Sequence, residues 1–232
     1  MNTKDLFGKA LYDYWFDNEP EDMLTWTHLT ESEVLPITYL FRSYNEMPET
    51  EQTALALASG KILDVGAGSG IHSAWLQENG KDVTALDYSE YGNKVLKDRG
   101  IKKIVKANFF DHEAQYDTIL LLMNGVGIVQ KAHNLDHLFQ HLNNLLTPNG
   151  QAFIHSSDLR YLYEDNGNYI LPKNEYYGDV QFFVSYKNEV ESFDWTYIDE
   201  ETLQRVALQN GFTGNKIVES EYGDFLMRFT RE

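Results

Sequence analysis

The residues most able to do chemistry lie in one short run, ILDVGAGSG, between Ile62 and Gly70. Gly66, Gly68 and Gly70 follow an apolar stretch that carries one acid, Asp64. A strand that turns through glycines into a helix lets a ligand approach the backbone closely, and unpaired N–H groups at the helix start point toward it. The run therefore predicts a binding site for a ligand that carries phosphate or carboxylate.

The spacing of these glycines separates two classes of ligand. A dinucleotide fingerprint, G-x-G-x-x-G, would need a third glycine where this chain has Ile71. The pattern present is G-x-G-x-G, with Asp64 two residues before the first glycine. A nicotinamide-dependent oxidoreductase is therefore disfavoured, although it stays open as an alternative.

A second acid follows at the expected distance. Residues 83–86 read as a short strand that ends at Asp87. The distance along the chain from the glycine run to Asp87 is close to the roughly 20 residues that separate such a run from a ribose-binding acid. An acid at the end of the second strand of a βαβ unit can accept hydrogen bonds from ribose hydroxyls. Asp87 is also a good cap for the helix predicted after Tyr88, and the two roles are compatible.

Two further strands end in residues suited to a binding site. The strand predicted at 103–105 leads to Asn108 and Phe109, and the apolar strand predicted at 116–122 leads to Met123, Asn124 and Gly125. The carboxyl ends of parallel strands meet at one edge of a sheet, so these residues are expected to lie near the glycine run.

Together these motifs resemble the class I S-adenosylmethionine-dependent methyltransferases over roughly residues 60–156, and more loosely over 199–230. The resemblance implies S-adenosylmethionine as cofactor, S-adenosylhomocysteine as product and a Rossmann-like fold. It implies that Asp64 and the glycine run hold the methionine end, that Asp87 holds the ribose, and that Asn108 and Phe109 contact the adenine. The implied cofactor-binding residues are Asp64, Gly66, Ala67, Gly68, Gly70, Asp87, Tyr88, Asn108, Phe109, Met123, Asn124 and Gly125.

Composition narrows the class of partner. The chain has 232 residues, no cysteine and a net charge of −17. The missing cysteine excludes disulfides, zinc–thiolate sites and a cysteine nucleophile. The negative charge disfavours nucleic acid and anionic membranes as partners, and no apolar run is long enough to span a bilayer. Because the N-terminus is unlike a signal peptide, the chain is expected to be cytoplasmic. A small molecule is the expected methyl acceptor, and a protein acceptor is the variant of that expectation.

The remaining elements complete a predicted α/β fold. Residues 1–58 are expected to form a helical extension, with helical stretches at 6–16 and 33–44. The resemblance implies that such an extension covers the cofactor as a lid, with an aromatic ring near the methyl group, for which Tyr12, Tyr14 and Trp15 are the candidates. The alternative is that these rings pack the helix on the surface of the domain. Residues 59–232 are expected to form a doubly wound, seven-stranded, mostly parallel sheet. A helix from Asp199 leads into its C-terminal antiparallel hairpin, with strands at 216–220 and 224–230.

An aromatic insertion at 159–198 interrupts this domain. Residues 180–186 and 190–198 read as a β-hairpin whose Phe193, Trp195 and Tyr197 alternate with polar residues. Its place after the fifth strand favours a cap over the substrate at the carboxyl edge of the sheet. The alternative is that the aromatic face mediates a homodimer.

The sequence offers only weak candidates for catalysis. Methyl transfer needs alignment more than a general base, so His155, Asp158 and Tyr14 are named only as candidates. His133, His137 and His141 have metal-ligand spacing but lie opposite a leucine stripe, which favours a polar helix face and no metal site. A non-catalytic protein that binds S-adenosylmethionine for regulation is the other alternative.

Overall fold

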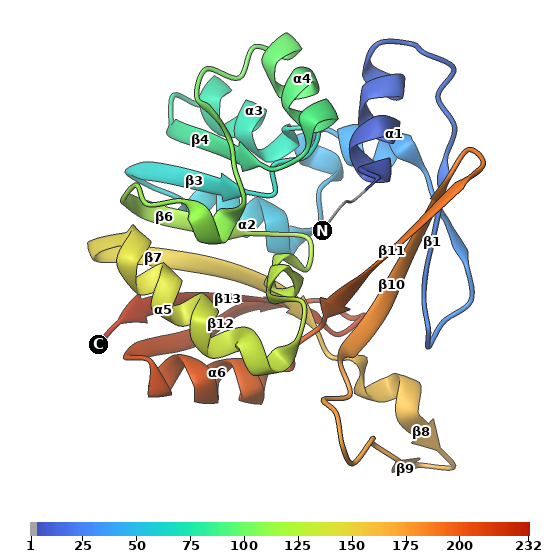
Figure 1. Cartoon of the computed structure of the whole chain (residues 1–232). Helices are drawn as coiled ribbons and strands as arrows, with labels where there is room; N and C mark the ends of the chain where they lie inside the picture. Colours follow the sequence, from blue (N-terminus) through green and yellow to red (C-terminus); the bar gives the residue numbers. More distant parts are fainter. Residues whose placement is uncertain (1–3) are drawn as a thin grey trace.

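A seven-stranded sheet forms the centre of the protein, in a computed structural model that describes residues 4–232 (Figure 1). The strand order is β12-β13-β7-β6-β3-β4-β5, and only β13 runs antiparallel to its neighbours. The predicted Rossmann-like sheet with a C-terminal antiparallel hairpin is confirmed. The strands are β3 (Lys61–Val65), β4 (Asp82–Asp87), β5 (Ile104–Lys106), β6 (Tyr116–Leu121), β7 (Leu146–Ser157), β12 (Phe212–Glu219) and β13 (Asp224–Arg231).

Helices cover both faces of this sheet, because successive residues of its strands point to opposite sides. Ile62 packs with α2 and α3, whereas its neighbour Leu63 packs with α5 and α6. Ala85 packs against Leu96 of α4 on the same face as α2 and α3. The helices are α2 (Glu49–Leu57), α3 (Ile71–Glu78), α4 (Glu90–Asp98), α5 (Leu135–Leu145) and α6 (Glu200–Gln209). None of the helices in the described part of the chain has the length and apolar character that crossing a membrane requires.

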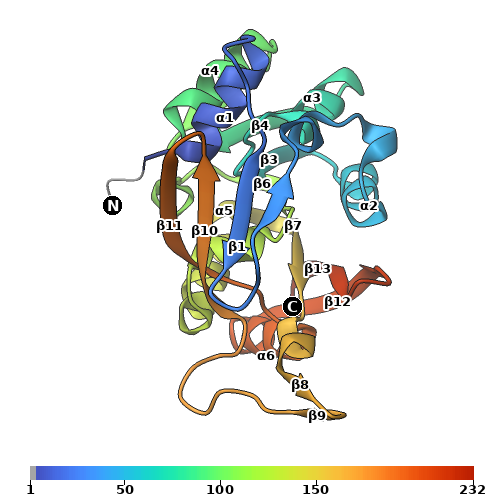
Figure 2. The same cartoon turned by 90° about the vertical axis from the view of Figure 1, so that its right-hand side faces the viewer.

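The inserted hairpin joins the N-terminal segment in a second sheet (Figures 1 and 2). Its order is β11-β10-β1-β2, with β1 (Met23–Thr27), β2 (Glu33–Leu35), β10 (Asp179–Tyr186) and β11 (Glu189–Thr196). The predicted hairpin is therefore confirmed, and strands from both ends of the chain pair with each other through β1 and β10.

The prediction of a wholly helical N-terminal extension is wrong. Helix α1 (Leu6–Trp15) and α2 are present, but residues 23–35 form strands, and two short 3-10 turns follow, η1 (Ile37–Phe41) and η2 (Tyr44–Glu46). Pairing with β10 overrides local helix propensity in β1. Pro36 disfavours helical backbone at the residue before it, so a helix cannot run continuously through 33–44.

Helix α1 links the second sheet to the central domain. Glu191 of β11 accepts hydrogen bonds from the Lys4 and Leu6 N–H groups, at 2.7 and 3.1 Å, and so caps the start of α1. On its other side, α1 packs against α4, and Trp15 donates to Asp98 at 2.8 Å. The side chain of Leu11 also approaches Gly68 of the glycine run.

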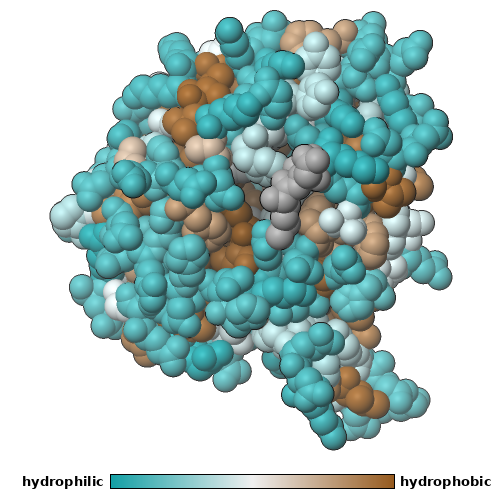
Figure 3. Space-filling model, viewed as in Figure 1, coloured by the Kyte–Doolittle hydropathy of each residue, from teal (hydrophilic) through white to brown (hydrophobic). Residues whose placement is uncertain are grey.

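A small arm projects from the domain below the second sheet (Figure 2). It contains η6 (Leu159–Tyr163) and the short strands β8 (Glu164–Asp165) and β9 (Asn168–Tyr169). Ile170, which follows β9, is 65% exposed. The face of the protein in Figure 3 is mostly hydrophilic, in keeping with the high net charge.

One close contact holds the second sheet against the central domain. The indole of Trp195 in β11 lies on Gly127 of η4 (Gly125–Val129), the turn that follows β6. A Cβ atom added to Gly127 would lie 2.0 Å from Cε2 of Trp195. Because Gly127 is not among the residues with positive φ, its role is to leave room for this ring.

Gly127→Ala should therefore lower the free energy of unfolding by about 1–3 kcal/mol, the usual cost of overpacking. Denaturant unfolding would measure it. The matched test is a double-mutant cycle with Trp195→Ala, in which the Gly127→Ala penalty should largely disappear. Additive losses in the cycle would show that the contact does not exist.

Candidate functional site

The glycine run forms a tight loop between β3 and α3. The Gly66 and Ala67 N–H groups donate to the Leu86 carbonyl at 2.8 and 3.1 Å, and all three glycines of the run have positive φ. A Cβ at Gly70 would lie 2.5 Å from Cδ2 of Leu96, whereas one at Gly66 would meet nothing within 4 Å. Gly70 is thus required by packing on α4, while Gly66 leaves an open face above the loop.

Asp87 lies beside this loop, where the sequence predicted it. Its Oδ2 accepts a hydrogen bond from the Gly68 N–H at 2.7 Å, and its Oδ1 accepts one from the Ser89 N–H at 2.8 Å. An ionised carboxylate has about four lone-pair sites, so both oxygens can accept a further hydrogen bond. The capping of α4 falls instead to Ser89, whose hydroxyl accepts from the Gly92 N–H at 2.7 Å.

Asp64 lies behind the loop and is only 2% exposed. Its Oδ2 accepts a hydrogen bond from the Ser73 hydroxyl at 2.7 Å, and its Oδ1 lies 3.9 Å from Nδ1 of His72. These contacts tie the end of β3 to the first turn of α3. Asp64 therefore fixes the backbone of the loop, and its predicted contact with a ligand stays a prediction.

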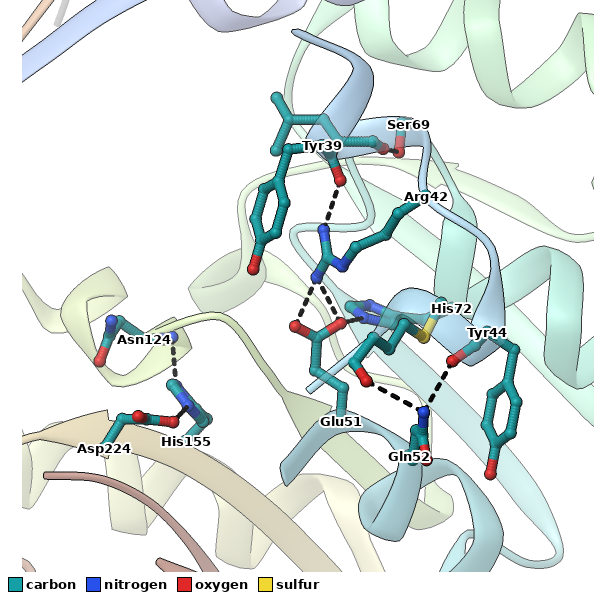
Figure 4. A network of polar contacts seen from close by, with 12 residues as sticks. Tyr39, Arg42, Tyr44, Glu51, Gln52, Ser69, His72, Asn124, His155 and Asp224 are labelled. Atoms are coloured by element: carbon teal, nitrogen blue, oxygen red, sulfur yellow. Dashed lines mark hydrogen bonds and ion pairs between the residues drawn. The ribbon is translucent and has the colours of Figure 1, made fainter. Parts of the chain in front are cut away.

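A line of buried polar side chains continues from Asp64 to the N-terminal segment. Figure 4 shows the part of it that His72, Glu51 and Arg42 form. Nε2 of His72 lies 2.7 Å from Oε2 of Glu51 in α2. The Arg42 guanidinium binds both oxygens of the same carboxylate, one of them at 2.5 Å. His72, Glu51 and Arg42 are all less than 9% exposed, so this network is shielded from water.

Burial and charged neighbours shift the pKa values of three acids in and beside this network. Burial raises the pKa of Asp64 above its ordinary value, and burial also raises the pKa of Asp87. Burial acts on Glu51 in the same direction, but the contacts from His72 and Arg42 outweigh it and lower the pKa of Glu51. Glu51 is therefore the negative centre that the two basic side chains share.

The turn after β6 has a strained backbone and is held by hydrogen bonds to residues of β7. Met123 and Asn124 have φ values of 53° and 56°, in the left-handed region that non-glycine residues seldom adopt. The Asn124 N–H donates to Nδ1 of His155 at 2.8 Å, and Nε2 of His155 lies 3.0 Å from Oδ2 of Asp224. The Ser157 hydroxyl donates to the Asn124 side-chain oxygen at 2.9 Å.

These contacts assign the tautomer of His155. A backbone N–H can only donate, so Nδ1 accepts and Nε2 carries the proton that it donates to Asp224. That bond lowers the pKa of Asp224. Both ring nitrogens of His155 are therefore engaged, and the side chain positions the turn that follows β6. Its predicted part in catalysis stays a prediction.

The other two catalytic candidates are engaged as well. Asp158 Oδ1 accepts from the Arg160 N–H and from the Tyr177 hydroxyl, each at 2.8 Å. It thereby caps η6 and anchors the arm. The ring of Tyr14 packs on Phe41, with ring centroids 4.6 Å apart, so it lies between α1 and η1 rather than pointing into open space.

The residues predicted to contact adenine are only partly available. Asn108 is exposed, and its side-chain oxygen accepts from the Phe110 N–H at 2.9 Å, which leaves a lone pair free. Phe109, in contrast, is 1% exposed, and its ring meets the edge of His141 in the core. Phe109 therefore has no exposed ring face on which a base can stack.

The histidines of α5 are part of this packing. His141 lies 2.8 Å from the Phe109 carbonyl, and His137 stacks on Phe110 at 4.6 Å. The predicted exposed face is thus correct for His133 and His137, whereas His141 is partly buried. Within residues 4–232, no group of three potential ligand side chains is placed to hold a metal ion.

Several residues of this site were missed by the reading of the sequence. Arg42, Glu51 and Tyr39 lie in a segment without a motif, and Asp224 was read only as part of a closing strand. His72 lies in the helix after the glycine run, and no signal in the sequence indicates a partner for it. Only the fold shows that these residues converge.

Glu51→Gln should lower the free energy of unfolding by about 3 kcal/mol at pH 7, because it removes the shared negative centre of a buried network. Since folding lowers the pKa of Glu51 below its ordinary value of 4.5, the stabilisation is complete above pH 4.5 and is lost as the pH falls through the lower, folded pKa. Urea unfolding of both proteins from pH 7 to 3.5 should show the difference shrinking below pH 4.5. Glu49→Gln, an exposed acid of the same helix, is the control. A difference independent of pH would contradict this account.

His155 can be tested with two amides of different length. Asn places an oxygen near the position of Nδ1 and can keep the Asn124 bond, whereas Gln reaches toward Asp224 instead. Hydrogen exchange of the Asn124 amide should stay near the wild-type rate in His155→Asn. It should speed up in His155→Gln and His155→Ala by an amount equivalent to about 1–3 kcal/mol. Equal protection in all three variants would rule out the positioning role.

Comparison with known proteins agrees with this geometry. Residues 38–216 match a family model described as a methyltransferase domain. A solved structure of an S-adenosylmethionine-dependent methyltransferase from Bacteroides fragilis, in complex with S-adenosyl-L-homocysteine, has 41% identity and a TM-score of 0.92. The match covers 98% of this chain and 95% of that one. No curated protein matches the chain.

More distant structures share the fold. An S-adenosylmethionine-dependent methyltransferase from Clostridium acetobutylicum has 14% identity and a TM-score of 0.61, with 81% of this chain and 93% of that chain covered. The 1,6-didemethyltoxoflavin-N1-methyltransferase of Burkholderia thailandensis has 17% identity and a TM-score of 0.51, with 79% and 78% covered. The family model and the Bacteroides structure show that this chain belongs to the class I S-adenosylmethionine-dependent methyltransferases.

Proposed function

We propose that this enzyme transfers a methyl group from S-adenosylmethionine to a small-molecule acceptor held between the second sheet and the carboxyl end of β6. The observation that carries this proposal is the contact between Trp195 and Gly127. It places the inserted hairpin directly over the turn that begins at Met123, where the resemblance puts the methyl donor opposite its acceptor. The hairpin is thus a wall of the site.

The described residues fit the cofactor. Gly66 leaves an open face beside the loop, and Asp87 keeps lone pairs for two adjacent ribose hydroxyls. Asn108 offers a carbonyl oxygen for the adenine amino group. The cofactor supplies a methyl carbon on a positively charged sulfur, a strong leaving group that needs no activation by the protein. The task of the chain is to align the acceptor and to exclude water.

The second sheet supports a flat, apolar acceptor. Phe182 and Phe193 stack at 5.4 Å, and Phe193 meets Trp195 edge to face at 5.9 Å. These three rings lie on one face of β10 and β11, and none of them is in the exposed class. Their position favours a cap over a dimer surface. A small-molecule acceptor is bound in the Burkholderia structure, which has the same fold.

The charge of the protein supports the same choice. At −17 the chain repels phosphate backbones, which disfavours nucleic acid as acceptor. A basic protein would be attracted, so it remains the competing acceptor class.

The experiment is transfer of a radiolabelled methyl group into a fractionated cell extract. Label should appear in the fraction of small, extractable molecules and not in protein or nucleic acid. Label in protein alone would show that the acceptor is a protein and not a small molecule. Label in no fraction, with cofactor binding intact, would indicate a protein that binds the cofactor without turnover.

Asp87→Ala should weaken S-adenosylhomocysteine binding by about 1.5–3 kcal/mol, the value of a hydrogen bond to a charged group. This corresponds to roughly 10- to 150-fold in Kd by calorimetry. Asp82→Ala, at the opposite end of the same strand, should bind normally. Unchanged affinity in a folded Asp87→Ala protein would remove Asp87 from the site.

A further inference from the structure

Tyr39 is held in a fixed orientation by the buried charge network. The Arg42 guanidinium lies 4.0 Å from the centroid of the Tyr39 ring, and its Nη1 donates to the Tyr39 carbonyl at 2.6 Å. Arg42 is in turn fixed by its two contacts with Glu51. A cation over a ring face and a buried carboxylate behind it leave this tyrosine little rotational freedom.

The segment that carries Tyr39 is also attached to the glycine loop. The Ser69 hydroxyl donates to the carbonyl of Leu40, the next residue along the chain. Arg99 of the α4 C-terminus donates to the Ser69 carbonyl at 3.0 Å. Movement of the cofactor loop would therefore move η1, and the position of Tyr39 is set by the same residues that shape the loop.

The hydroxyl of this fixed side chain has no partner. Within residues 4–232, no group hydrogen-bonds to it, and the residue is 39% exposed. Figure 4 shows it directed into the space between Glu51 on one side and the group of Asn124, His155 and Asp224 on the other. The negative charges of Glu51 and Asp224 both act to raise the pKa of Tyr39.

We propose that the Tyr39 hydroxyl contacts the acceptor where the methyl group is transferred. The proposal rests on the proposed function, since it takes the end of β6 as the place where the donor meets the acceptor. A polar group that is rigidly held and unpaired gains the most from a ligand, because little entropy remains to be lost. The two tyrosines of α1 are the other candidates for this contact. The ring of Tyr12 packs against Phe16, and the ring of Tyr14 packs against Phe41.

The role is hydrogen bonding rather than proton removal. Burial raises the pKa of Tyr39, and the charges of Glu51 and Asp224 act in the same direction, against the effect of Arg42. The phenol therefore stays protonated near neutral pH. It orients the acceptor heteroatom so that its lone pair faces the methyl carbon, and any proton released by the acceptor goes to solvent.

The position of Tyr39 can be tested without knowing the acceptor. 3-Fluorotyrosine is introduced at position 39 by stop-codon suppression, and its titration is followed by fluorine NMR in the S-adenosylmethionine and S-adenosylhomocysteine complexes. The two ligands differ by the methyl group and the positive charge on sulfur. A nearby positive charge stabilises the phenolate, so the midpoint should lie at lower pH in the S-adenosylmethionine complex.

The same label at Tyr44 is the matched control. Tyr44 belongs to the same segment, but its ring stacks on Trp75 of α3 at 4.5 Å, and Figure 4 shows its hydroxyl directed away from this space. Its midpoint should be the same in both complexes. Identical midpoints at position 39, with calorimetry showing that both ligands bind, would overturn the role of Tyr39. If neither ligand binds, the proposed function fails and the role of Tyr39 fails with it.

A second variant tests the contact with the acceptor found by methyl transfer into extract. Tyr39→Phe should keep the Kd for S-adenosylhomocysteine within about twofold and lower kcat/KM for that acceptor by roughly 10- to 100-fold, the effect of one lost hydrogen bond. Tyr44→Phe should match the wild type. Unchanged kcat/KM in Tyr39→Phe would also overturn the proposal.

Discussion

The buried contacts that Glu51 makes with Arg42 and His72 are the interaction on which the rest of the site depends. An isolated charge in a protein interior is costly, so the Glu51 carboxylate and the Arg42 guanidinium are each tolerated only because the other is in place. The network begins behind the glycine loop at Asp64 and ends beneath Tyr39. The loop that is proposed to bind the cofactor and the segment that is proposed to meet the acceptor are therefore one electrostatic unit.

The acceptor side of the site has a different origin. It is built from segments distant in sequence, in which β1 pairs with β10 and Trp195 of β11 packs on Gly127 after β6. Helix α1 connects this second sheet to the cofactor side. Glu191 of β11 caps the start of α1, and the opposite side of α1 packs against α4. One half of the site is thus fixed by charges and the other by the packing of aromatic rings.

The glycine loop and the place of Asp87 beside it could be predicted from the sequence because their signals are local. A glycine run, and Asp87 at the end of a strand, depend on residues adjacent in the chain, and the parallel sheet follows from their order. The network of Arg42 and Glu51 could not be predicted, since it joins residues without a motif across three elements. Strand β1 was missed for a related reason, because its pairing partner β10 lies about 160 residues away, and β2 in turn pairs with β1. Phe109 satisfied a family pattern, yet packing placed its ring in the core.

The glycine loop and the segment that bears Tyr39 are expected to respond to the cofactor as one unit. Hydrogen exchange with and without S-adenosylhomocysteine tests this expectation directly, with peptides that cover residues 66–73 and 37–47. The account predicts that the ligand protects both segments in the wild-type protein, and that Glu51→Gln keeps the protection at 66–73 while losing it at 37–47. Protection confined to 66–73 in the wild-type protein would contradict the account.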